Sequence, residues 1–161
     1  MIDLSLLSSL PITNRITIPS DYLDEMGHMN IMYYIHIFDR AAWGLFELFG
    51  VTIKELESYG GGMFALKQFI QYLAEVHVGE TVAVRSRVLG VSHRRIHFMH
   101  FMINETTGKL ASTFEVLGSY ADLNTRRTAP FPDSIAARIQ DHLQHDQSLP
   151  WDAPICGILK P

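Results

Sequence analysis

Apolar residues recur at helical spacing between residues 31 and 49 and nowhere else over so long a stretch. Asn30 is a favoured N-cap residue ahead of this stretch, and Gly50 is a favoured stop after it. The apolar positions three or four residues apart are Ile35, Phe38, Ala42, Leu45 and Phe49, and Met32, Ile37 and Trp43 widen the stripe. The pattern predicts one long helix, Ile31 to Phe49, buried on most sides.

Strand patterns dominate the rest of the chain. A short strand is expected at residues 15–19, and long strands at 63–76, 80–91, 95–104 and 109–123. Residues 51–59 suggest a short helix, residues 60–62 a chain break, residues 105–108 a hairpin turn, and residues 134 to about 145 a capped C-terminal helix. This order predicts an α+β fold in which an antiparallel sheet wraps around a single central helix.

Length and composition restrict the class of protein. The 161 residues are 47% hydrophobic and 19% charged, which suits one globular domain. A net charge of -4 with scattered basic residues argues against nucleic acid as a partner, and no stretch reaches the roughly 20 apolar residues of a membrane span. The single cysteine, Cys156, cannot form an internal disulfide, which fits a cytoplasmic protein, and residues 1–10 resemble no signal peptide.

The loop before the predicted helix gathers the chemistry of the chain. Asp24 supplies a carboxylate, Gly27 can take a positive φ, His28 supplies an imidazole and Asn30 caps the helix. The first free N–H groups of the helix, at about Asn30 and Ile31, would polarise a carbonyl group and stabilise an oxyanion. A nearby carboxylate can attack that carbonyl or deprotonate a water molecule, so Asp24 is the candidate nucleophile or general base.

The spacing Asp24-x-x-Gly27-His28-Met29-Asn30-x-x-x-Tyr34, with Gly79-Glu80 in a later turn, resembles the hotdog-fold acyl-CoA thioesterases of the 4-hydroxybenzoyl-CoA thioesterase type. It is also similar to the motif of plant acyl-ACP thioesterases, except that Met26 and Ile31 stand where those enzymes have asparagine. The resemblance covers about residues 13–132 of a single domain, 1–161, and leaves residues 133–161 as a C-terminal extension with a tail helix.

The resemblance implies hydrolysis of acyl-CoA to a carboxylate and free CoA, without cofactor or metal. It implies catalytic roles for Asp24, His28 and Asn30, and weaker substrate contacts from Gly27, Tyr34, Phe64 and Gln68. It also implies a homodimer joined edge to edge, or a homotetramer, with interfacial active sites that strand residues 65–68 of a neighbouring chain complete.

Each candidate also has a structural interpretation. Asp24 could close an Asx turn on its own backbone, His28 could anchor the loop, and Asn30 could be a cap alone. Asp39 within the helix could be a second catalytic acid or a solvent-facing residue.

His93, His97 and His100 do not converge in a strand, so no metal is predicted. The pairs Arg94-Arg95 and Arg126-Arg127 could bind phosphates or simply face solvent, and the strand aromatics could line a pocket or form core.

Two other functions remain open on the sequence. A hotdog hydratase or dehydratase would need an acid and a histidine along the helix, for which His36 and Asp39 are a poor pair. A module that binds acyl-CoA without turnover would not need Asp24. Coenzyme A or an acyl carrier protein could carry the substrate, and the acyl group is not defined.

Overall fold

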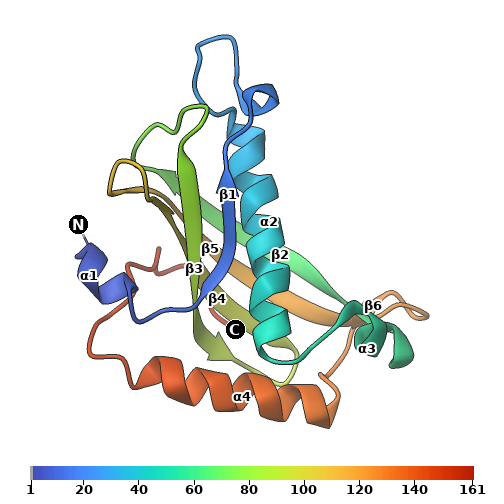
Figure 1. The fold of residues 1–161 in the computed structure, drawn as a ribbon. Coiled ribbons are helices and arrows are strands. Elements are labelled where there is room, and N and C mark those ends of the chain that lie inside the picture. Colours follow the sequence, from blue (N-terminus) through green and yellow to red (C-terminus); the bar gives the residue numbers. More distant parts are fainter. Residues whose placement is uncertain (1) are drawn as a thin grey trace. The chain divides into compact units, whose positions relative to one another are not determined.

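The computed structural model describes residues 2–161 and has the α+β architecture that the sequence predicts (Figure 1). Its helices are α1 (Leu4–Leu7), the short 3-10 helix η1 (Ser20–Tyr22), α2 (Ile31–Leu48), α3 (Ile53–Ser58) and α4 (Asp133–Gln147). Its strands are β1 (Ile12–Thr17), β2 (Gly61–Tyr72), β3 (Thr81–Val91), β4 (Arg95–Asn104), β5 (Lys109–Asp122) and β6 (Arg127–Thr128). The strands form one antiparallel sheet in the order β1-β3-β4-β5-β2, with β6 beside β5.

The long helix, the four long strands and the C-terminal helix therefore confirm the predicted order. Two local predictions were wrong. The chain breaks only at Gly60, because Gly61 and Gly62 already belong to β2. A side chain at Gly61 would meet the ring of Tyr120, so this glycine is required by close packing rather than by a turn. Helix α4 begins at Asp133 behind Pro132, without the side-chain cap that we expected.

Contacts along the chain divide it into two compact units. The first holds the described residues up to Leu45 together with Ile70–Arg87 and His100–Phe114, and the second holds Phe46–Phe69, Val88–Met99 and Glu115–Pro161. Within residues 2–161, no helix is long and apolar enough to cross a membrane.

In the first unit, helix α2 packs closely against β1. Gly44 provides the necessary space, because a Cβ atom there would lie 2.1 Å from the carbonyl oxygen of Thr13. Asn14 Nδ2 donates to the carbonyl of Ile37 at 3.0 Å, which fixes the strand to the helix. Phe38 stacks on Phe114 with ring centroids 4.9 Å apart. The middle and the second half of α2 are therefore held in this unit by one tight crossing with β1 and by aromatic packing.

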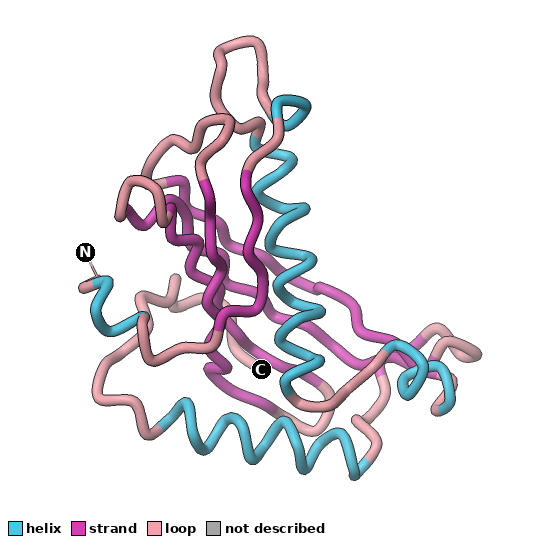
Figure 2. Tube along the Cα trace, viewed as in Figure 1, coloured by secondary structure: helices cyan, strands magenta, loops and turns pink. Residues whose placement is uncertain are grey.

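In the second unit, helix α4 buries Ile135, Ile139 and Leu143. Arg138 donates through Nη1 to the carbonyl of Gly50 at 2.6 Å and pairs with Glu55 of α3. The irregular segment after α4 (Figure 2) is tied to β5, since the N–H of Cys156 donates to the buried Glu115 at 2.7 Å. This unit is thus closed by its C-terminal extension.

Replacing Gly44 by alanine is expected to destabilise the protein although alanine favours helices. Helix propensity alone would stabilise the variant by up to about 1 kcal/mol, whereas the clash with Thr13 is expected to cost about 1–3 kcal/mol. Urea denaturation measures the free energy of unfolding. Gly62→Ala is the control, because its nearest neighbouring atoms lie at 3.5 Å. A Gly44→Ala variant as stable as the parent would contradict the tight crossing.

Stability is expected to fall in acid because of His100. This histidine is fully buried, its Nδ1 lies 2.6 Å from Ser86 Oγ, and burial lowers its pKa from 6.5 to about 3. The unfolded chain therefore binds a proton below pH 6.5 that the folded chain excludes. The contribution of the neutral His100 side chain to the free energy of unfolding is complete above pH 6.5. It is lost progressively as the pH falls towards 3.

Urea denaturation between pH 7 and pH 4 tests this dependence. The wild type is expected to lose up to about 1.4 kcal/mol per pH unit from this group, and His100→Gln is expected to lack that component. His93→Gln is the matched control, since His93 is exposed. Equal pH slopes for wild type and His100→Gln would overturn this account.

Candidate functional site

The loop between η1 and α2 is fixed mainly by its own backbone (Figure 2). Leu23 and Met29 form an isolated antiparallel bridge, and the N–H of Asp24 donates to the carbonyl of His28 at 2.9 Å. Gly27 makes the turn possible with a φ of 84°, and its N–H donates to the carbonyl of Asp24 at 3.1 Å. The loop is therefore a short hairpin that presents Asp24 and His28 at its base.

Two further contacts dock this hairpin in the first unit. Met29 is 3% exposed, and its N–H donates to the carbonyl of Val76 at 2.8 Å, in the segment that follows β2. Tyr22 of η1 stacks on Tyr33 of α2 with ring centroids 3.8 Å apart. The hairpin is thus fixed to both the helix start and the connection from β2 to β3.

The Asp24 carboxylate has one oxygen bound and one oxygen available. Its Oδ1 accepts from the N–H of Met26 at 2.9 Å and from the N–H of His28 at 3.2 Å. The Asx-type closure that the sequence left open is therefore present. Within the described chain, Oδ2 has no hydrogen-bond partner. Because the side chain is half-buried and fixed through Oδ1, the second oxygen is held in a defined position.

Asn30 has a clear structural role at the start of α2. Its Oδ1 accepts from the N–H of Met32 at 3.0 Å, which is the expected cap. Its own N–H donates to the carbonyl of Tyr22 at 2.9 Å, so our expectation that this N–H is free for an oxyanion was wrong. The N–H of Ile31 has no acceptor among residues 2–161, and the Ile31 side chain is 65% exposed. Ile31 is therefore the available donor at this helix start.

His28 faces residues that the sequence analysis missed. Its Nε2 lies 3.6 Å from Glu75 Oε1, and His77 Nε2 lies 3.8 Å from Glu75 Oε2. His77 Nδ1 lies 3.4 Å from the carbonyl oxygen of Gly27. The only sequence signal was the polar cluster 75–77 directly after an apolar strand, and nothing in it indicated that Val76 receives the Met29 N–H.

A surface groove of about 350 Å³ runs past these residues. It is lined by Asp24, His28, Met29, Ile31, Tyr34, Tyr72, Leu73, Ala74 and Glu75. Tyr34 is buried and meets Tyr72 edge to face, with ring centroids 5.1 Å apart and planes at 85°. Burial, followed by the charges of Tyr72, Glu75 and Glu80, raises the pKa of Tyr34 to about 12, so this phenol stays neutral. The groove thus combines a carboxylate, a helix start and an aromatic wall.

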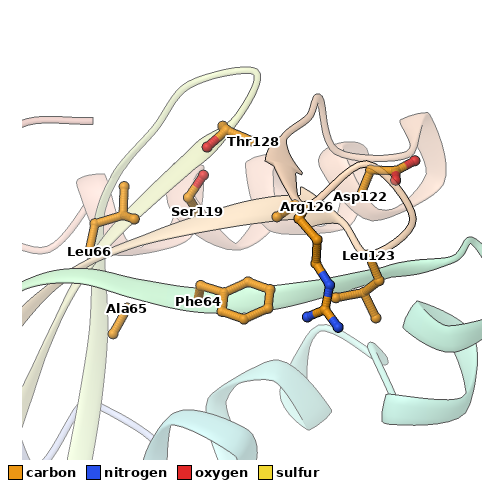
Figure 3. Close-up of a pocket in the computed structure, with 9 residues that line it drawn as sticks. Phe64, Ala65, Leu66, Ser119, Asp122, Leu123, Arg126 and Thr128 are labelled. Atoms are coloured by element: carbon orange, nitrogen blue, oxygen red, sulfur yellow. The ribbon is translucent and has the colours of Figure 1, made fainter.

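Other candidates lie elsewhere. Phe64 and Gln68 are exposed on β2, and neither lines the Asp24 groove. Phe64 lines a second groove of about 350 Å³ in the second unit, together with residues of β5, β6 and the turn between them (Figure 3). Arg126 of that turn has a φ of 57°. His36 and Asp39 are exposed on α2 and line neither groove.

Two of the strand histidines contact other side chains of the structure. His97 Nε2 lies 2.8 Å from the buried Glu115 carboxylate, and His100 contacts Ser86. In the part of the chain that the structure describes, no three His, Cys, Asp or Glu side chains are placed to hold a metal ion.

Comparison with known proteins agrees with this architecture. Residues 18–139 match the family model of the thioesterase-like superfamily. A betainyl-CoA thioesterase of Pseudomonas aeruginosa is 25% identical over 89% of this chain and 91% of its own length. A chloroplastic acyl-acyl carrier protein thioesterase of Arabidopsis thaliana is 23% identical over 80% of this chain and 68% of its own length.

Solved structures share this fold. A hypothetical protein from Staphylococcus aureus, solved in complex with CoA, superposes with a TM-score of 0.81 at 26% identity, over 89% of this chain and 90% of that one. A DHNA-CoA thioesterase from the same species has the same fold, with a TM-score of 0.73 at 20% identity over 82% of this chain and 92% of that one. This chain therefore belongs to the thioesterase-like superfamily, and it is a thioester hydrolase with a hotdog fold.

Proposed function

We propose that this protein hydrolyses an acyl-CoA in the Asp24 groove, with Asp24 as nucleophile or general base. The proposal rests on the different environments of the two oxygen atoms of the Asp24 carboxylate. Oδ1 is held by the N–H groups of Met26 and His28, and Oδ2 is left without a partner among the described residues. A carboxylate held in this way loses little freedom when it meets the carbonyl carbon. The solved relative that contains CoA supports coenzyme A as the carrier.

The N–H of Ile31 is the proposed donor to the developing oxyanion. It lies at the N-terminus of α2, where the aligned peptide dipoles give a partial positive charge. The Asn30 cap satisfies the Met32 N–H and leaves that of Ile31 for the substrate. A preorganised donor of this kind typically contributes about 10²–10³ in rate.

The nucleophilic route proceeds in two steps. Asp24 Oδ2 attacks the thioester carbon, negative charge moves to the carbonyl oxygen, and the carbon–sulfur bond then breaks to release CoA as a thiolate that takes up a proton. Water next hydrolyses the acyl anhydride to give the carboxylic acid and regenerates Asp24. As a general base, Asp24 would instead take a proton from the water that attacks the carbonyl. In either route His28, held beside Glu75, would position the carbonyl or the water.

We further propose a homodimer through β2, which can pair again into a tetramer. β2 lies at one end of the sheet order, and a long apolar edge strand is a template for pairing. Its exposed apolar side chains are Phe64, Leu66, Phe69 and Tyr72. In such a dimer, residues 65–68 of one copy would complete the other copy's site, which gives the exposed Phe64 and Gln68 a role in substrate binding.

Asp24→Asn is expected to lower turnover of an acyl-CoA by roughly 10²–10⁴-fold. The asparagine keeps an Oδ1 acceptor for the two loop N–H groups, so the fold is expected to be unchanged. Release of free thiol from a panel of acyl-CoAs measures the reaction. Asp39→Asn, which removes an exposed acid of α2, is the matched control and should retain activity. Undiminished turnover by a folded Asp24→Asn variant would reduce Asp24 to a loop residue.

The double variant Leu66→Lys/Phe69→Lys is expected to be monomeric, because charge on an edge strand opposes pairing. Sedimentation equilibrium measures the mass of wild type and variant. Ile155→Lys is the control, since Ile155 is equally exposed but lies in the C-terminal extension. A monomeric wild type, or a variant that still pairs, would contradict the proposed interface.

A further inference from the structure

The Asp24 groove carries more negative charge than hydrolysis requires. Glu75 lines it in addition to Asp24, and its side chain is 67% exposed. Its nearest ionisable neighbours are His28 and His77, whose Nε2 atoms lie 3.6 Å and 3.8 Å from its carboxylate oxygens, and both distances are too long for good hydrogen bonds. Among the described residues that line the groove there is no lysine or arginine. Within one copy of the chain, Glu75 is therefore a carboxylate at the groove without a lysine or arginine in its lining.

Glu80 does not line the groove but adds to its negative field. Its Oε2 accepts from the N–H of His77 at 2.8 Å and from Asn104 Nδ2 at 2.7 Å. Both Glu75 and Glu80 contribute to the raised pKa of Tyr34, which indicates that their field extends to the groove lining. A field that disfavours a phenolate favours a positive charge at the same place.

Aromatic rings accompany this negative charge. Tyr72 is 46% exposed and lines the groove beside Tyr34, with the two ring planes nearly perpendicular. Aromatic faces attract cations through their quadrupole, and rings set at an angle with a nearby carboxylate are a recurrent receptor for quaternary ammonium ions. Such an ion needs no hydrogen-bond acceptor and is only weakly hydrated, so it suits this apolar and acidic surface better than a primary amine.

We propose that the acyl group hydrolysed here carries a quaternary ammonium ion, which Tyr72 contacts and Glu75 attracts. The inference rests on the proposed function of the groove as the thioester site. The groove of about 350 Å³ is at the small end of the range for ligand sites. Anionic acyl groups, such as those of dicarboxylic acids, would be repelled by Glu75 and Asp24.

Two thioesters of the same shape separate charge from size. Trimethylammonioacetyl-CoA and tert-butylacetyl-CoA differ only in a cationic nitrogen in place of a carbon atom. The wild type is expected to have a kcat/KM at least roughly tenfold higher for the cationic thioester, which is the range of one cation–π contact with a carboxylate nearby. The readout is the ratio of the two kcat/KM values in a variant relative to that ratio in the wild type, because the electron-withdrawing effect of the ammonium group on the thioester carbonyl is the same in both proteins and cancels.

Variants then identify the residues that determine the ratio of the two kcat/KM values. Glu75→Gln and Tyr72→Leu are each expected to reduce the ratio several-fold, whereas Tyr72→Phe, which keeps the ring, should preserve it. Glu57→Gln is the charge-matched control, since Glu57 is an exposed glutamate of α3 that does not line the groove, and it should leave the ratio unchanged. Circular dichroism confirms that each variant is folded.

The possible outcomes distinguish the two proposals. Equal hydrolysis of both thioesters by the wild type, or a ratio that Glu75→Gln and Tyr72→Leu leave unchanged, would overturn the charge selectivity and leave the thioesterase site intact. Hydrolysis of neither thioester, nor of any other acyl-CoA in the panel, would overturn the proposed function of the groove and this inference with it.

Discussion

The candidate site depends on the hydrogen bond from the N–H of Met29 to the carbonyl of Val76. This bond attaches the motif hairpin to the chain segment that follows β2, and the burial of the Met29 side chain keeps water away from it. Because Val76 lies between Glu75 and His77, the same bond brings these side chains to the loop that carries His28. Without this bond, the position of Glu75 relative to His28 would not be fixed.

Structural and chemical roles coincide at this loop. Asp24 closes the turn through Oδ1, and this bond to its own loop is what holds Oδ2 in place for chemistry. Asn30 likewise caps the helix through its side chain while its N–H binds Tyr22, and the pair of bonds leaves Ile31 as the exposed donor. The structural roles of Asp24 and Asn30 are therefore compatible with their proposed roles in catalysis, and the proposed roles depend on them.

The sequence predicted most of the fold because its signals were local. The helical spacing of Ile35, Phe38 and Leu45 defined α2 almost to its ends, and the dense aromatic stretch of β4 was placed without error. Predictions failed where a distant residue decides the conformation. Gly61 looked like a chain break, yet it continues a strand because the ring of Tyr120 occupies the space of a side chain.

The same limit applies to the site. Asp24, Gly27, His28 and Asn30 are contiguous in sequence, so their grouping was readable. Glu75 and Tyr72 are separated from them by some forty residues or more, and no periodicity or spacing connects the two segments. The pairing of Met29 with Val76 and the ring contact of Tyr34 with Tyr72 bring these side chains to one groove.

The acidic character of the groove poses an electrostatic problem for hydrolysis. A tetrahedral intermediate places a negative charge at the carbonyl oxygen, near the carboxylate of Glu75, and the partial charge of the α2 N-terminus is only about half an elementary charge. An acyl group that carries its own permanent cation would offset Glu75 as it binds. The repulsion on the developing oxyanion would then fall in every subsequent step, whereas a neutral acyl group would leave the full repulsion in place. In the proposed arrangement, the charge that would select the substrate would also lower the barrier to its hydrolysis.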